Sequence, residues 1–201
     1  MDLPGSQHES ADVMPLKSLD PNPALILVDL QNPFVQAPPA RRVVDRATEL
    51  AAAFRDRRLA VVLVQLAYGD TAPPGRTDHP GTPHRAWSPR GDGVSIVDEL
   101  AGHPGDIIVT KRNWGAFYGT DLDLHLRRRG VNQIVLGGIA TSIGVESTAR
   151  SAHEHGYHLA LVTDAMADLD PDSHRHSITK IFPRLGQTTT TAEILAALGT
   201  R

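Results

Sequence analysis

Three positions at the ends of apolar runs carry the residue types and spacing that proton-transfer chemistry needs. Asp29 follows the apolar run at residues 24–28, Lys111 follows the run at 106–110, and Gly144 closes the turn after 133–138. Such runs are typical of buried parallel strands, whose carboxyl ends meet at one edge of a sheet. A carboxylate beside an ammonium in a partly dry pocket can move protons, because burial and pairing shift its pKa in opposite directions. Taken singly, Asp29 and Lys111 are each more typical of a salt bridge that closes the end of the sheet; together, beside the turn at Gly144, they favour a site.

The turn that contains Gly144 has the pattern of a strand that leads directly into a helix. Residues 134–136 are apolar, a Gly-Gly pair follows, and Thr141 and Ser142 are residue types that cap helix N-termini. Glu146 follows at a spacing that could return a bond to the helix start. The N–H groups of a helix N-terminus favour a bound oxygen or anion. By itself the segment is more typical of an ordinary strand–helix unit than of a site.

The remaining chain alternates strands with helices, which predicts an α/β fold. We expect a three-layer, doubly wound sheet of about six mostly parallel strands with helices on both faces. In the usual strand order we expect the strands that end at Asp29 and Lys111 to be neighbours, with the two side chains within ion-pair reach. The expected strands are 24–28, 59–66, 106–110, 133–138, 157–163 (ending at Asp164) and 187–190, and the expected helices are 43–57, 94–100, 122–129, 143–155, 173–182 and 192–198.

Length and composition limit the classes of function. The 201 residues suit one domain at 22–201, preceded by an arm at 1–21 that is either flexible or placed between subunits. A net charge of −3 gives no electrostatic case for nucleic acid or a membrane surface as a partner. The chain has no cysteine, which excludes disulfides, thiolate metal sites and a cysteine nucleophile. A cytoplasmic protein is the expectation.

Residues 29–32, 109–111, 138–149 and 164–168, in that order and each after a predicted strand, together resemble the isochorismatase-like (cysteine hydrolase) superfamily. The resemblance runs from about residue 23 to the C-terminus and implies a parallel six-stranded core. Amidase members of this superfamily use an Asp, a Lys and a Cys. Asp29 and Lys111 match the first two, and Gly144 occupies the Cys position, so the covalent thioester route is closed to this chain.

The resemblance also implies a reaction that needs no nucleophilic side chain, because isochorismatases carry a glycine at this position. Asp29 would protonate the carbon of a small anionic vinyl ether such as isochorismate, Lys111 would hold the carboxyl group, and water would add to the oxocarbenium ion. One alternative is hydrolysis of a small amide or imide by water that Asp29 activates. Another is a catalytically silent protein that binds a small acid or serves in an assembly. A homo-oligomer without a cofactor is expected.

A cis peptide bond often precedes the nucleophile turn in this superfamily, and here it would join Ile139 to Ala140. That bond would direct the Ala140 N–H into the pocket beside the Gly144 backbone N–H, in the manner of an oxyanion hole. An ordinary trans turn is the alternative.

Further substrate-binding residues are expected around this centre. The resemblance suggests Gln65 at the end of the second strand. Phe34, Trp114 and Tyr118 could wall the pocket, although core packing is the more common role of aromatic residues. Arg76 lies in the long loop at residues 68–93 and could clamp a substrate carboxylate, although a solvated loop arginine is an equal alternative. Asp70, His79 and His84 invite a metal interpretation, but the tight Asp-x-His spacing is absent and no metal is expected.

Overall fold

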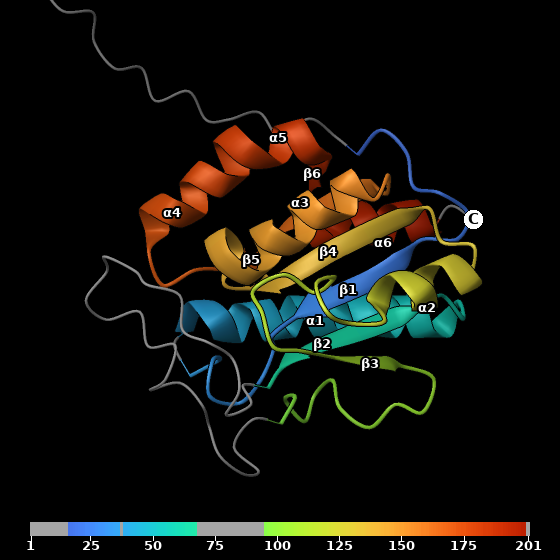
Figure 1. The fold of residues 1–201 in the computed structure, drawn as a ribbon, viewed down its shortest axis with the longest axis horizontal. Helices are drawn as coiled ribbons and strands as arrows, with labels where there is room; N and C mark the ends of the chain where they lie inside the picture. Colours follow the sequence, from blue (N-terminus) through green and yellow to red (C-terminus); the bar gives the residue numbers. More distant parts are fainter. Residues whose placement is uncertain (1–15, 37, 68–94, 200–201) are drawn as a thin grey trace, which may run out of the picture.

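The fold is built on a six-stranded sheet in the order β3-β2-β1-β4-β5-β6, in which all five strand pairings are parallel (Figure 1). The structure, a computed structural model, describes residues 16–36, 38–67 and 95–199. The strands are β1 (Ala24–Val28), β2 (Val61–Leu66), β3 (Ile107–Lys111), β4 (Gln133–Ile139), β5 (His158–Ala167) and β6 (Gln187–Thr189). The predicted doubly wound α/β fold is confirmed.

Helices cover both faces of this sheet and create two apolar layers. The first layer packs α1 and α6 against one face, and the second packs α2, α3 and α5 against the other, because alternate strand residues point to opposite faces. The helical elements are α1 (Pro38–Asp56), α2 (Leu122–Arg128), the π-helical turn η2 (Thr141–Val145), α3 (Glu146–Glu154), α4 (Pro171–His176), the π-helical turn η3 (Ser177–Ile181), α5 (Phe182–Leu185) and α6 (Thr191–Gly199).

The strand order contradicts one prediction about the site. The strands that lead to Asp29 and Lys111 are not neighbours, since β2 lies between β1 and β3. The order reverses direction between β1 and β4, so the switch point of the sheet lies where Asp29 and η2 begin. The predicted contact must therefore reach across the end of β2.

One predicted helix is wrong, and one predicted strand ends later than expected. Residues 95–100 contain an isolated bridge between Ile96 and Gln31 and a turn, and no helix, because the segment pairs with the chain after β1. Strand β5 does not end before Asp164 but continues to Ala167, after an irregularity that inserts extra residues into its pairing with β4. The polar Thr163 and Asp164, which resemble a strand end in the sequence, are the residues of this irregular stretch.

Helix boundaries also move. Helix α1 begins at Pro38, five positions before the predicted start, because proline is well tolerated in a first helical turn. Gly130 follows α2 with φ of 64°, the left-handed helix end that its sequence position predicts.

The segment before β1 packs on the amino-terminal side of the sheet. The backbone N–H of Asp20 donates to Gln133 Oε1 at 2.6 Å and the N–H of Lys17 donates to Gln187 Oε1 at 2.6 Å. Leu19 joins the apolar layer beneath α1. Residues 16–21 of the predicted arm thus contact their own domain, and residues 1–15 lie outside the described residues.

Candidate active site

Asp29 reaches the site because the backbone turns sharply at the end of β1. Val28 belongs to the layer under α3, and regular alternation would point the next side chain to the opposite face. Asp29 instead has φ of 56°, a left-handed conformation that few non-glycine residues adopt. This conformation brings its carboxylate to the face on which Lys111 lies, and Oδ2 accepts a hydrogen bond from Lys111 Nζ at 2.7 Å.

Lys111 is a fully buried ammonium with two identified acceptors. Its side chain is 1% exposed, and Nζ also donates to the backbone carbonyl of Trp114 at 2.6 Å. It is the last residue of β3 and shares its face with Ile107 and Val109, whose side chains pack in the layer under α2 and α3. A buried charge needs such partners, because desolvation of an unpaired ion costs several kcal/mol.

Burial controls the protonation of Asp29. Desolvation raises the pKa of this carboxyl from its ordinary value to about 6, and the charge and hydrogen bond of Lys111 oppose that rise. Its second oxygen, Oδ1, is buried and has no hydrogen-bond partner among the described residues. A buried carboxylate oxygen without a partner is costly in a stable core and is expected where a substrate or a proton is to be received.

The π-helical turn η2 places Gly144 directly against Asp29. A Cβ atom at Gly144 would lie 3.2 Å from Asp29 Oδ2 and 3.3 Å from the Ile139 carbonyl oxygen, so a side chain there would press on the carboxylate. The preceding Ile139–Ala140 peptide bond is cis, which decides between the two alternatives that the sequence leaves open. The close approach of β4 to β1 requires Gly138, because a Cβ atom there would lie 2.2 Å from the Val28 carbonyl oxygen.

Thr148 ties this turn to the loop that serves Lys111. Its hydroxyl donates to the Gly144 carbonyl at 2.7 Å and accepts from the Ala116 N–H at 3.1 Å. Ala116 is two residues from Trp114, whose carbonyl receives the Lys111 ammonium. A single buried hydroxyl therefore connects the surroundings of Gly144 with those of Lys111.

The start of η2 is held from outside by two residues rather than by its predicted caps. Thr141 and Ser142 lie inside the π turn, and no side-chain cap bond is made by the N-cap residue Ala140. The Ser142 N–H donates to Asp168 Oδ2 at 2.6 Å, and Thr141 Oγ1 lies 2.8 Å from His174 Nδ1. The predicted return bond of Glu146 is also wrong.

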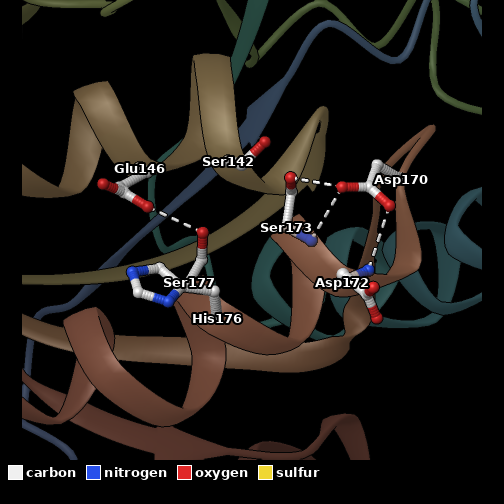
Figure 2. Close-up of a pocket in the computed structure, with 7 residues that line it drawn as sticks. All are labelled: Ser142, Glu146, Asp170, Asp172, Ser173, His176 and Ser177. Carbon is white, nitrogen blue, oxygen red and sulfur yellow. Dashed lines mark hydrogen bonds between the residues drawn. The ribbon is translucent and has the colours of Figure 1, made fainter.

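Glu146 instead binds forward to the next helical segment. Its Oε2 accepts from the Ser177 hydroxyl at 2.6 Å, and its Oε1 pairs with Arg150. Figure 2 shows the Glu146–Ser177 bond across an open hollow between η2 with α3 and α4 with η3. The hollow shares Ser142 with the turn but contains neither Asp29 nor Lys111.

A buried glutamine closes the other side of the Asp29 turn. The Leu66 N–H donates to Gln31 Oε1 at 2.7 Å, and Gln31 Nε2 donates to the Leu66 carbonyl at 3.3 Å. The Asp29 N–H donates to the Val64 carbonyl at 2.9 Å. The side chain of Gln31 thus continues the strand pairing with β2 at the point where β1 turns away.

The other predicted substrate contacts have different positions. Gln65 donates to Thr110 Oγ1 at 2.8 Å and shares the α1 face with Leu63, opposite to Lys111. Trp114 and Tyr118 are exposed in the loop after β3, and Phe34 is partly buried against the α1 layer. Their contacts with a substrate stay a prediction. Arg76 and the metal candidates Asp70, His79 and His84 lie outside the described residues.

Within the described part of the chain, no group of three or more His, Cys, Asp or Glu side chains could hold a metal ion. In the same residues, no helix has the length and apolar character required to cross a bilayer. Burial lowers the pKa of His174, and the negative charge of Asp168 opposes this shift. The lowered pKa favours the neutral imidazole beside Thr141.

Sequence reasoning missed Asp168 and His174 as residues of this site. Asp168 was missed because the sequence pattern placed the end of β5 before Asp164. In the structure, Asp164 accepts hydrogen bonds from the N–H and hydroxyl of Thr191 at the start of α6. A signal was present in the mostly polar residues 168–174, which follow the apolar residues 165–167. Residues 165–167 are the true end of the strand.

Comparison with known proteins places these features in one family. The Isochorismatase domain model matches residues 23–193. The chain is 44% identical over 174 residues to the isochorismatase family protein YwoC of Bacillus subtilis, covering 86% of this chain and 92% of that protein. An isochorismatase family protein from Burkholderia thailandensis superposes with a TM-score of 0.84 at 44% identity, over 90% of this chain and 98% of that one.

An N-carbamoylsarcosine amidase from Thermoplasma acidophilum is more distant, with a TM-score of 0.70 and 29% identity over 85% of this chain and 96% of that one. The match therefore spans nearly the whole domain, including Asp29, Lys111 and the turn η2 with Gly144. The family model over residues 23–193 and the 44% identity to YwoC show that this chain, which has no cysteine, belongs to the isochorismatase family of hydrolases.

Proposed function

We propose that this protein hydrolyses a small anionic vinyl ether, of the type of isochorismate, by acid catalysis without a nucleophilic side chain. The observation that carries the proposal is the buried Asp29 carboxyl, with one oxygen on Lys111 and the other without a partner among the described residues. The protonated oxygen would donate its proton to the terminal carbon of the enol ether. Water would then add to the oxocarbenium ion, and the resulting hemiketal would collapse to a ketone and an alcohol.

The proton affinity of Asp29 fits the role of a general acid. Because burial raises its pKa to about 6, roughly a tenth of the molecules carry the proton at pH 7. A carboxyl group with its ordinary pKa would be protonated in fewer than about one molecule in a thousand at that pH.

Lys111 and Gly144 would serve the same step in different ways. The ammonium fixes Oδ2 at 2.7 Å, so only Oδ1 remains to meet the substrate. Gly144 keeps the space next to the carboxylate clear, because a Cβ atom there would already be in tight contact with Oδ2. Backbone N–H groups of Ala140 and Gly144 would hold an oxygen of the anionic substrate.

Hydrolysis of an amide or imide is the second candidate, favoured by the similarity to an N-carbamoylsarcosine amidase. In that case Asp29 would act as a base and remove a proton from the attacking water. The two candidates need opposite protonation states of the same carboxyl group. The dependence of rate on pH therefore separates them.

The test measures product formation by mass spectrometry with isochorismate and a panel of small amides, using the wild type and Asp29→Asn. For the vinyl ether we expect kcat/KM to fall about tenfold per pH unit above pH 6, where Asp29 loses its proton. Asp29→Asn should reduce the rate by about 10²- to 10⁴-fold.

Vinyl-ether turnover that survives Asp29→Asn would disprove the acid role. Amide turnover that falls below pH 6 and is constant above it would favour the base mechanism instead. If neither substrate class reacts, hydrolysis of these substrates is disproved and a binding or assembly role is favoured instead.

A further inference from the structure

The first two residues of η2 are each held by a side chain from the segment that follows β5. Asp168 Oδ2 accepts from the Ser142 N–H at 2.6 Å, and His174 Nδ1 lies 2.8 Å from Thr141 Oγ1. Thr141 is completely buried, so its hydroxyl has little access to water as an alternative partner. The turn that carries Gly144 is thus anchored from outside its own strand and helix.

An irregularity in β5 places Asp168 where it can do this. Between the pairs Leu136–Leu161 and Gly138–Met166, the chain advances two residues along β4 but five along β5. Pairing then resumes, and Ala167 lies opposite Ile139. Asp168 therefore emerges beside Ala140, at the start of the π turn. Bulges of this kind redirect a side chain next to a functional site.

The anchored turn lies next to the proposed acid. A Cβ atom at Gly144 would lie 3.2 Å from Asp29 Oδ2, so the backbone of η2 forms one wall around that carboxylate. Since a protein interior is densely packed, displacement of this wall would admit water to Asp29 and alter its desolvation.

We infer that Asp168 and His174 are positioning residues that hold η2 against Asp29 and so keep the carboxyl group dry. This positioning role depends on the proposed function only for its expected effect on the reaction rate. Its effects on the turn and on Asp29 can be measured without any substrate. Neither residue touches the reacting atoms, so both act through the position of Gly144.

A third bond between the same segments provides a matched control. Ser177 Oγ donates to Glu146 Oε2 at 2.6 Å across the hollow in Figure 2, one helical turn beyond Ser142. Ser177→Ala removes this bond, but Glu146 is on α3 and has no part in the start of η2. This variant therefore separates the general effect of losing one hydrogen bond between the two segments from the specific effect of losing the Asp168 or His174 anchor.

The experiment compares Asp168→Ala and Asp168→Asn with the wild type and Ser177→Ala. Two readouts need no substrate: amide hydrogen exchange at Ser142, and the titration midpoint of Asp29 followed by carboxyl carbon NMR. We expect Asp168→Ala to speed Ser142 exchange by at least about tenfold and to lower the Asp29 midpoint by about half a unit or more. Asp168→Asn, whose amide oxygen can still accept the bond, should restore both.

His174→Leu and His174→Asn form a second pair, because an asparagine side chain can replace Nδ1 as a partner of Thr141. If Asp168→Ala does not fold, this second pair tests the inference by the same two readouts, Ser142 amide exchange and the Asp29 titration midpoint. The inference is overturned if the anchor variants leave the Asp29 midpoint at its wild-type value, if Ser177→Ala shifts it equally, or if the asparagine variants fail to rescue it.

With a reacting vinyl ether, kcat should fall about tenfold in Asp168→Ala while KM stays within about twofold. If wild-type protein turns over no vinyl ether, the proposed function fails. Ser142 exchange and the Asp29 midpoint still decide the positioning role in that case.

Discussion

Strand β3 has an ion pair at each of its ends, and the two pairs differ in how fully they satisfy the carboxylate. At the amino-terminal end, Asp106 receives Arg55 Nε at 3.2 Å on one oxygen and Arg55 Nη2 at 2.5 Å on the other. At the carboxyl-terminal end, Lys111 binds one oxygen of Asp29 and leaves the other without a described partner.

The difference follows from the two cations. A guanidinium presents a planar fork that matches both oxygens of a carboxylate, whereas an ammonium is a point charge that fixes one of them. Arg55 also donates to the Leu100 carbonyl at 2.9 Å, which ties α1 to the loop before β3. The Asp106 pair is therefore suited to hold the structure together, and the Asp29 pair is suited to chemistry.

The same substitution at the two ends should give opposite results. Asp29→Asn should reduce turnover by about 10²- to 10⁴-fold, because the acid is lost while an amide oxygen remains for Lys111. Asp106→Asn should lower the free energy of unfolding by about 2 kcal/mol, because the charged two-point contact with Arg55 is lost, and should leave turnover within about threefold. Chemical denaturation and steady-state kinetics of both variants provide the check. Comparable activity losses in the two would remove the distinction.

Replacing Lys111 by a shape-matched apolar residue should sharpen the comparison further. In Lys111→Met, loss of the ammonium leaves desolvation unopposed and raises the pKa of Asp29 above its wild-type value of about 6. The pH above which vinyl-ether turnover falls should move upward by about one unit or more, equivalent to about 1.4 kcal/mol. Arg55→Met is the control, and a shift of the pH profile in that variant would contradict the assignment of roles.

The smallest effect is expected at Gly144. A methyl group there would meet Asp29 Oδ2 and Val28 Cγ1 at 3.2 Å, while alanine is also a better helix former than glycine. The two contributions oppose each other, so stability should change by about 1 kcal/mol or less while kcat falls several-fold. Gly199→Ala, with nothing within 4 Å of the added carbon, is the matched control. Equal kinetics in the two variants would show that space beside Asp29 is unimportant.

Much of this arrangement is predictable from local sequence. The apolar runs before Asp29 and Lys111 lie where strands end in the structure, since continuous apolar segments of strand length belong to buried parallel strands. The family resemblance suggests a cis bond at Ile139–Ala140 but leaves an ordinary trans turn open, and only the structure decides that the bond is cis. Prediction failed at residues 95–100, where pairing of Ile96 with Gln31 overrides a helical pattern.

The sequence by itself determined the fold class, the strand ends at Asp29 and Lys111 and the absence of a thiol nucleophile, because each depends on residue type and local periodicity. Only the tertiary structure decided that β2 separates β1 from β3 and that a positive φ turns the Asp29 carboxylate to the face on which Lys111 lies. It also decided that Asp29 Oδ1 has no hydrogen-bond partner among the described residues. The irregular pairing that brings Asp168 to the π turn likewise depends on contacts between strands. Such contacts join residues far apart in the chain, and no local pattern records them.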